Sequence, residues 1–283
     1  MEAGRRNKIK VGAIIQARMK SIRLPGKVLL PLPFNSDQTL LSWPVKRLQN
    51  SKMIDAIILA TSVNEENNEL KKIAEKLDIF FYAGSEDNVL ERFVGAAGSH
   101  QLDALVRITG DNPIIDEQLI DKLIVLHIEG DYDYSYSTNL PIGMNVEVVN
   151  VAALMEIYNR KDLQASDKEH VTYFFKREHI YRVYKHDFRF STKKSIRLTV
   201  DYPADYAMMN LVTSISNATN LSGIKLVEFI EANHGWVFEI NNSLFQKKQY
   251  SSFDEEVVDS MNMLQLQEFN FTIDFLKRKL NEA

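Results

Sequence analysis

Short apolar runs alternate with amphipathic stretches along most of the chain. The apolar runs have the length and the Val, Ile and Tyr content of β-strands, and they fall at residues 11–15, 56–61, 79–82, 105–109, 132–136, 146–149 and 196–200. Between them, apolar residues recur every three or four positions, as in amphipathic helices, at residues 40–48, 65–77, 89–97, 116–127, 152–158 and 204–215. This alternation predicts an α/β protein of three layers, with helices on both faces of a mostly parallel sheet.

The pattern changes twice along the chain. After about residue 130 the predicted strands come closer together, which indicates a mixed sheet with a hairpin-like excursion. From about residue 241 the pattern loosens into polar residues, and a helical pattern then resumes over residues 254–280. We therefore predict one α/β domain at residues 9–240 and a C-terminal helical extension at residues 241–283.

The composition excludes several classes of function. With 283 residues, 45% of them hydrophobic, the chain is long enough to bury a large core. A net charge of −4 and a pI near 5.9 argue against bulk nucleic-acid binding, although a local basic pocket is compatible with them. The absence of Cys excludes disulfides, thiolate zinc sites and cysteine nucleophiles. The first apolar run is too short for a signal peptide or a membrane span, so we expect a cytoplasmic protein without a membrane partner.

Charged residues gather where predicted strands end. Asp111 and Asp201 each follow an apolar run, and the first strand leads into a basic loop that contains Arg18, Arg23 and Lys27. Open α/β sheets bind ligands at the carboxyl ends of their strands. Mg²⁺ usually takes one or two carboxylates together with phosphate oxygens and water. The pattern therefore predicts a magnesium-assisted site for a polyphosphate, with both aspartates as ligands.

The basic loop matches neither of two common phosphate-binding motifs. A Walker A loop needs Gly-Lys followed by Ser or Thr, whereas Gly26-Lys27 is followed by Val28. A dinucleotide fingerprint needs three glycines after the first strand, and this loop supplies basic side chains instead. The guanidinium groups of Arg18 and Arg23 can bind phosphate oxygens as planar forks, and the Lys27 ammonium can act as a mobile point charge. The alternative is that the loop is only a solvated surface.

Each candidate metal ligand also has a purely structural interpretation. Asp111 could start a turn or cap the helix that begins near Asp116. Asp201 could belong to a helix N-terminus, with Asp205 in its first turn. The presence of both aspartates together with the basic loop favours the metal site over these alternatives.

Several short motifs occur in order over residues 9–240. They are Ile14-Ile-Gln-Ala-Arg-Met-Lys-Ser-Ile-Arg-Leu-Pro-Gly-Lys-Val-Leu-Leu-Pro-Leu32, Ala60-Thr-Ser62, Gly84-Ser-Glu-Asp-Asn-Val-Leu-Glu-Arg-Phe93, Arg107-Ile-Thr-Gly-Asp-Asn-Pro113, Asn145-Val-Glu-Val148, Glu169-His-Val171 and Leu198-Thr-Val-Asp-Tyr-Pro203. Together they resemble the cytidylyltransferase family that includes spore-coat polysaccharide biosynthesis protein F, related members of which activate sialic, legionaminic and Kdo-type acid sugars as CMP conjugates. The resemblance implies a nucleotide-diphospho-sugar transferase (GT-A-like) fold and transfer of CMP from CTP with release of pyrophosphate.

The resemblance also implies roles for individual residues. The catalytic residues are expected to be Arg18, Lys27, Asp111 and Asp201, with Mg²⁺ held by the two aspartates. The expected nucleotide-binding residues are Ala13, Ile15, Gln16, Arg18, Arg23, Lys27, Asn88 and Arg92. Within this set, the strand-end backbone from Ala13 to Gln16 reads the base edge, whereas Asn88 and Arg92 lie near the cytidine. The expected acceptor-binding residues are Asn139, Glu147, Glu169 and His170.

Some of these roles have alternatives in the sequence. Arg92 could form only a helix-surface ion pair with Glu91, and His170 could be structural, because no second His lies at ligand spacing. Two segments also depart from the family pattern. Residues 33–38 replace a short Gly-containing turn, and Ile142 and Asn145 stand where acidic residues are common. These differences concern the acceptor rather than the nucleotide.

We therefore expect a Mg²⁺-dependent cytidylyltransferase that uses CTP and a small-molecule acceptor, an acid sugar or a related surface-glycan precursor. The alternatives are a nucleotidyltransferase that uses another NTP, and a sugar-nucleotide-binding glycosyltransferase or a non-catalytic binding protein of the same fold. The excursion at residues 132–149 is expected to form a homodimer interface, unless Tyr132, Tyr134 and Tyr136 only cover the edge of the sheet.

Overall fold

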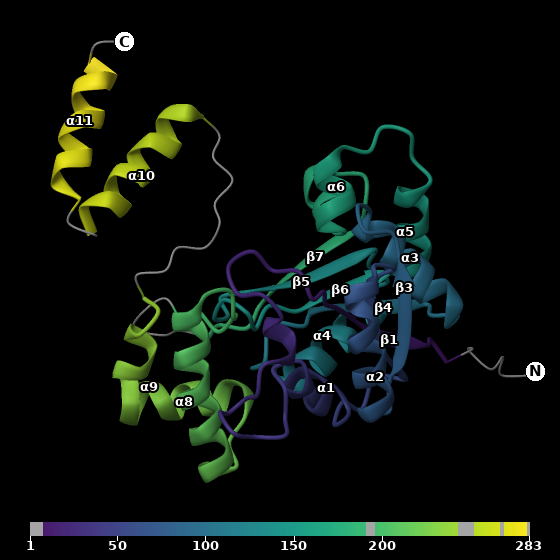
Figure 1. The fold of residues 1–283 in the computed structure, drawn as a ribbon. Helices are drawn as coiled ribbons and strands as arrows, with labels where there is room; N and C mark the ends of the chain where they lie inside the picture. The colour runs from purple at the N-terminus through teal and green to yellow at the C-terminus, as the bar shows by residue number, and fades with distance from the viewer. Residues whose placement is uncertain (1–7, 191–195, 243–251, 267–268, 282–283) are drawn as a thin grey trace, which may run out of the picture. The chain divides into compact units, whose positions relative to one another are not determined.

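The chain divides into two compact units, Met1–Asn242 and Ser243–Ala283. The computed structural model describes residues 8–190, 196–242, 252–266 and 269–281. In the first unit, seven strands form one sheet in the order β3–β2–β1–β4–β6–β5–β7 (Figure 1). The strands are β1 (Val11–Gln16), β2 (Ala56–Ser62), β3 (Phe80–Gly84), β4 (Ala104–Thr109), β5 (Tyr134–Thr138), β6 (Glu147–Asn150) and β7 (Val183–Asp187).

The sheet is parallel except where β6 enters it. β1 pairs in parallel with β2 and β4, and β2 with β3. β6 is antiparallel to both β4 and β5, and β5 is parallel to β7. The predicted mixed, mostly parallel sheet is confirmed, because β5 and β6 form the hairpin-like excursion.

Helices cover both faces of this sheet (Figure 1). One face is covered by α1 (Ser42–Leu48), α2 (Asn68–Lys76) and α4 (Glu117–Glu129), and the other by α3 (Val89–Ser99), α5 (Val151–Tyr158) and α7 (Tyr173–Arg177). The short helix α6 (Ala165–His170) contacts α3. The three-layer α/β fold predicted from the alternation of strands and helices is confirmed.

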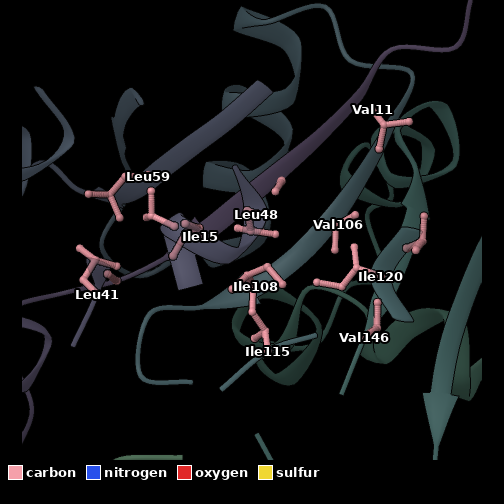
Figure 2. Close-up of a cluster of buried hydrophobic side chains, with 14 of the residues drawn as sticks. Val11, Ile15, Leu41, Leu48, Leu59, Val106, Ile108, Ile115, Ile120 and Val146 are labelled. Atoms are coloured by element: carbon pink, nitrogen blue, oxygen red, sulfur yellow. The ribbon is translucent and has the colours of Figure 1, made fainter. Parts of the chain in front are cut away.

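Strand β1 lies at the centre because its sequence is apolar on both sides. Ala13 and Ile15 belong to the cluster under α1, α2 and α4, whereas Ile14 belongs to the cluster on the opposite face, and all three are fully buried. Figure 2 shows Ile15 within the first cluster, between Leu59 of β2 and Ile108 of β4. A parallel strand with neighbours and helices on all sides requires such a continuous apolar run.

A third hydrophobic cluster joins residues 196–200 to α8 (Pro203–Thr219), α9 (Gly223–His234) and the 3-10 helix η3 (Gly235–Glu239). The prediction of a strand at 196–200 is wrong, because this extended segment forms only an isolated bridge, between Arg197 and Ile142. The next residue, Gly143, turns the chain away with a φ of 96°, and a Cβ there would lie 2.8 Å from the backbone of Leu198. A side chain at position 143 would therefore separate the two segments.

Other elements differ from the prediction because the segments that form them are polar or short. β7 alternates exposed and half-buried polar residues, as edge strands do, and therefore shows no apolar run. The helix α9 was also missing from the predicted elements. The single helix predicted at 254–280 is two helices, α10 (Phe253–Leu266) and α11 (Asn270–Asn281). The two helices contact each other, and Ile273 of α11 is buried. Over the described ranges, no helix has the length and apolarity that a membrane span needs.

Candidate functional site

Two neighbouring parallel strands bring the basic loop to the first candidate carboxylate. Gln16 at the end of β1 pairs with Thr109 at the end of β4, so the loop after β1 and the turn that contains Asp111 leave the sheet at the same edge. The extended segment before Asp201 joins them, because the backbone N–H of Val200 donates to the carbonyl of Asp111 at 2.9 Å. Asp111 and Asp201 thus come from distant parts of the sequence to adjacent positions.

The ammonium group of Lys27 lies between the two carboxylates. Its Nζ is 2.7 Å from Oδ2 of Asp111, 3.0 Å from Oδ1 of Asp201 and 2.7 Å from the carbonyl oxygen of Val200. Lys27 is the first residue of the 3-10 helix η1 (Lys27–Leu29), and only 7% of its surface is exposed. Three acceptors match the three N–H groups of an ammonium, so this group is fully satisfied.

Asp201 is held by two further cations. Arg23 Nη2 donates to Oδ1 of Asp201 at 2.7 Å, and Arg197 Nη2 donates to Oδ2 at 2.7 Å. The guanidinium of Arg23 also lies over the ring of Tyr202, 4.8 Å from its centroid. Burial alone would raise the pKa of Asp201, but Lys27, Arg23 and Arg197 lower it below its usual range. Asp201 therefore stays ionised at neutral pH.

A buried network of hydrogen bonds fixes the position of Arg197. Its guanidinium contacts the fully buried carboxylate of Asp205 at 3.2 Å, and Asn241 donates both to that carboxylate, at 2.8 Å, and to the Arg197 carbonyl, at 3.1 Å. Asp205 also accepts the backbone N–H groups of Asp201 and Tyr202, each at 2.9 Å. The position of the Asp201 carboxylate is thus set through both its side chain and its backbone.

The helix caps that compete with the metal interpretation are made by other residues. Asp116 accepts the first N–H groups of α4, and Asp205 makes the corresponding bond at the start of α8. In the hydrogen bonds of the described residues, the carboxylates of Asp111 and Asp201 meet only the cations Lys27, Arg23 and Arg197 and cap no helix. The structural interpretation is thus confirmed in part: Asp111 lies in the turn after β4, and Asp201 directly precedes the N-cap of α8, with Asp205 in the first turn, but neither of the two carboxylates caps a helix.

The geometry fits a divalent cation, with the lysine ammonium as a stand-in ion. One positive nitrogen already lies within 3.0 Å of an oxygen from both Asp111 and Asp201. Outside the segments that the structure leaves out, no group of three or more His, Cys, Asp or Glu side chains is arranged to hold a metal ion. Two carboxylates from the protein, with phosphate and water oxygens completing the shell, is the arrangement that Mg²⁺ adopts with nucleotide substrates.

Arg18 and Arg92 place two further positive charges near the same edge. Arg18 is exposed and makes no hydrogen bond or ion pair to another described residue. Arg92 is buried, donates to the carbonyls of Ser85 and Glu86, and leaves its Nε without a described partner. Burial lowers the pKa of Arg92, Glu86 opposes this, and the charge of Arg18 lowers it further. Two cations close enough to repel each other can be balanced by an anionic ligand.

The remaining predicted nucleotide-binding residues differ in their surroundings. Asn88 caps α3 by accepting the N–H of Glu91 at 3.1 Å. Ala13 and Ile15 are fully buried, and as residues of β1 their backbone groups point toward β2 and β4, so they do not themselves face a ligand. Gln16, the last residue of β1, keeps a buried side-chain Oε1 without a described partner. Of this strand-end group, Gln16 has an unused polar atom.

Glu147 lies at the centre of a second charged cluster. It accepts from Arg107 at 2.8 Å, from Lys176 at 3.0 Å, from Thr172 at 3.2 Å and from the hydroxyl of Tyr134. Burial would raise the pKa of Glu147, but Arg107 and Lys176 outweigh it and lower the pKa to about 2. Burial and Glu147 together raise the pKa of Tyr134. Glu147 is therefore a permanent carboxylate rather than an acid or a base at neutral pH.

A polar cavity of about 150 Å³ lies beside this cluster. It is lined by Arg107 and Thr109 of β4, by Asn112 next to Asp111, and by Asn145 and Glu147, together with two isoleucines. Asn145, at which the sequence departs from the family pattern, therefore lines the same cavity as Glu147. Among its lining residues, Asn112 directly follows Asp111 in the sequence, and the cavity offers amide and hydroxyl groups for polar ligands.

The other predicted acceptor-binding residues lie on separate segments. His170 ends α6, and its carbonyl accepts the backbone N–H of Thr172, which links it to Glu147. Glu169 is exposed on the same helix. Asn139, with a φ of 56°, is exposed after β5 and hydrogen bonds to Asp187, where it lowers the pKa of that carboxyl. Neither Glu169 nor Asn139 lines the cavity beside Glu147.

Sequence reasoning missed Arg107 and Arg197 as site residues. Both are charged residues inside apolar runs, Arg107 between Val106 and Ile108 and Arg197 between Ile196 and Leu198. A charge at such a position requires a partner when the run is buried, and this signal could have identified both. Asn241 carried no such signal, because its partners are distant in the sequence.

A mixed α/β sheet with cations over paired carboxylates at its carboxyl edge defines a nucleotidyltransferase-type protein. The family model described as "Cytidylyltransferase" matches residues 12–244. The chain therefore belongs to the cytidylyltransferase family. The model ends at residue 244, so α10 and α11 lie beyond it.

Three known proteins illustrate the relationship. The spore coat polysaccharide biosynthesis protein SpsF of Bacillus subtilis is 36% identical over 229 residues, which cover 78% of this chain and 93% of that protein. An uncharacterized protein of Methanocaldococcus jannaschii is 32% identical over 241 residues, which cover 84% and 97% of the two chains. The structure of a cytidylyltransferase from Leptospira borgpetersenii aligns with a TM-score of 0.74 at 25% identity, covering 86% of this chain and 100% of that chain.

Replacement of Glu147 by Gln should change how stability depends on pH. The folded pKa of about 2 lies below the ordinary value of 4.5, so the stabilising effect of the carboxylate is complete above pH 4.5 and is lost as the pH falls toward 2. We expect Glu147→Gln to lower the free energy of unfolding by on the order of 3 kcal/mol at pH 6, and by much less at pH 3. Urea unfolding at both pH values measures this, with exposed Glu69→Gln as the control. An equal difference at the two pH values would contradict the prediction.

Proposed function

We propose that this cytidylyltransferase carries out the Mg²⁺-dependent transfer of CMP from CTP to an acid sugar or a related surface-glycan precursor, with release of pyrophosphate. The observation that carries the proposal is the convergence of Asp111 and Asp201 on one cation beneath a loop with unneutralised positive charge. The family supports CTP as the nucleotide. The acceptor class rests on the motif resemblance to acid-sugar enzymes and on the name of the related SpsF protein.

The residues of the site act on charge and position. In this transfer an acceptor oxygen attacks the α-phosphate in line, and negative charge builds on the phosphate oxygens and the leaving pyrophosphate. Mg²⁺ bound by Asp111 and Asp201 would supply positive charge against these oxygens. Arg18 would bind the outer phosphates with its planar fork, and Arg23 and Arg197 hold Asp201 in position. A bound nucleotide would balance the repulsion between Arg18 and Arg92.

The acceptor is proposed to bind in the cavity lined by Arg107, Asn145 and Glu147. The cavity is polar, and Asn112 connects it directly to Asp111. His170 is proposed to contribute at its margin through Thr172, whereas Asn139 and Glu169 require a loop rearrangement to reach the acceptor. Asn88 is proposed to act indirectly, by fixing the start of α3 near Arg92.

We also propose that the protein is a homodimer in the cytoplasm, where it would consume CTP. β7 covers one side of the 132–149 excursion, and Tyr132 stacks on Tyr184 of that strand at 4.8 Å. Among the described strands β7 is the last of the sheet, and its outer edge suits pairing with a second copy. Light scattering should give twice the chain mass of 32.6 kDa at micromolar concentration, and a monomer mass would reject the dimer.

Pyrophosphate release tests the proposed reaction directly. We expect release with CTP and an acid sugar in the presence of Mg²⁺, and at least tenfold slower release with UTP, because a pocket that pairs with the cytosine amino group leaves buried groups unpaired with uracil, at roughly 1–3 kcal/mol each. Asp111→Asn and Asp201→Asn should each reduce turnover by orders of magnitude, and exposed Glu75→Gln should not. Equal rates with all four NTPs, or full activity of both Asn variants, would reject the assignment.

Replacement of Arg18 should distinguish triphosphate from monophosphate binding. A charge-assisted contact is worth about 1.5–3 kcal/mol, so Arg18→Ala should weaken CTP about ten- to a hundredfold. CMP lacks the outer phosphates, so its affinity for Arg18→Ala should be nearly the same as its affinity for the wild type. Arg18→Lys should restore CTP binding only in part, because a point charge cannot replace a bidentate fork. Calorimetric titration measures both nucleotides, and equal losses for CTP and CMP would show that Arg18 does not hold the outer phosphates.

A further inference from the structure

We propose that Lys27 occupies the metal position while the nucleotide site is empty, so that the triphosphate must draw its ammonium away before Asp111 and Asp201 can hold a divalent cation. The inference rests on the proposed function and adds an order of assembly to it. The nucleotide binds first or together with its metal, and the metal alone binds poorly.

The Lys27 ammonium and a divalent cation compete for the same oxygens of Asp111 and Asp201. The Lys27 ammonium lies 2.7 Å from an Asp111 oxygen and 3.0 Å from an Asp201 oxygen, and it is almost fully buried. Mg²⁺ binds carboxylate oxygens at about 2.0–2.1 Å and needs space for its remaining ligands. The ammonium and a metal ion shared by the same two oxygens would occupy overlapping space. The second oxygen of Asp201 offers no alternative, because Arg197 holds it at 2.7 Å.

The charges of the cluster balance while Lys27 is in place. Three carboxylates are balanced by three cations, the carboxylates being Asp111, Asp201 and Asp205 and the cations Arg23, Lys27 and Arg197. A divalent cation added without an anion would leave the cluster with two uncompensated positive charges in a partly buried site. A triphosphate brings negative charge both for the metal and for a displaced ammonium.

The side chain of Lys27 can move while the carboxylate of Asp201 keeps its position. The backbone of Lys27 is held in η1, where its N–H donates to the Leu24 carbonyl at 3.3 Å and its carbonyl accepts the Leu30 N–H at 3.1 Å. Its four-carbon side chain can therefore swing about a fixed base. When the ammonium leaves, Arg23 and Arg197 still hold Asp201. Asp201 loses one of its three cations and the Val200 carbonyl loses a donor, whereas Asp111 loses the one cation that it contacts among the described residues, and its side chain is 25% exposed.

Direct Mn²⁺ binding to the nucleotide-free protein tests this occupancy. Lys27→Met removes the ammonium at nearly constant side-chain length, and we expect it to bind one Mn²⁺ at least tenfold more tightly than the wild type, as measured by electron paramagnetic resonance of free Mn²⁺. Lys27→Arg, which retains a cation, should remain as weak as the wild type. Asp111→Asn added to Lys27→Met should abolish the gain, which would assign the new site to the aspartate pair. Lys72→Met, on the exposed face of α2, is the control for general charge removal.

Equal Mn²⁺ affinity in the wild type and Lys27→Met, without nucleotide, would overturn the proposal. Circular dichroism verifies that the variants are folded, and Lys27→Gln serves as a second neutral variant with the same expected gain. In the wild type, a non-hydrolysable CTP analogue should raise Mn²⁺ affinity by a larger factor than in Lys27→Met, because only the wild type has an ammonium to displace. A factor that is equal in the two proteins would also count against the proposal. The nucleotide-free measurement requires no CTP, so a gain there together with absent CTP binding would reject the proposed function and leave only the occupancy of the metal position by Lys27 standing.

Discussion

The bridge that Lys27 makes between Asp111 and Asp201 is the interaction on which the site depends. It joins three segments that are far apart in the sequence: the loop after β1, the turn after β4 and the extended segment before α8. Two ionised carboxylates at this separation would repel each other without a cation between them. In the proposed function, the same repulsion favours a metal ion between them. One constraint thus links how the loops are held together to the metal site that we propose.

The support behind Asp201 gives this arrangement its rigidity. Arg197, Asp205 and Asn241 form a buried hydrogen-bonded network, and Asp205 in addition binds the backbone on either side of the Asp201 carbonyl. Transfer to phosphorus is accelerated mainly by positioning and by fixed charges. A carboxylate held by both its backbone and its side chain therefore meets this requirement better than one held by a flexible loop.

The reversed strand β6 brings Glu147 to the end of the sheet at which Asp111 lies. Because β6 runs antiparallel to β4, Glu147 at its start lies directly opposite Arg107. In a parallel arrangement the start of β6 would lie at the other edge of the sheet, away from Asp111. The hairpin-like excursion, which interrupts the parallel pattern, therefore brings a second charged cluster and its cavity to the end of the sheet at which Asp111 lies.

The sequence by itself determined the α/β class, most of the strands and helices, and the family. It did so because strands with a buried apolar run, such as β1, and helices with a regular apolar stripe, such as α4, carry their burial pattern locally. It also indicated which charged residues follow strand ends. It failed where a segment is polar, as in β7, or where an apolar run such as 196–200 packs against helices instead of joining a sheet. The partners of the charged residues were decided only by the tertiary structure. Pairings such as Lys27 with Asp111 and Arg107 with Glu147 depend on which strands lie side by side and in which direction, and local spacing does not encode that order.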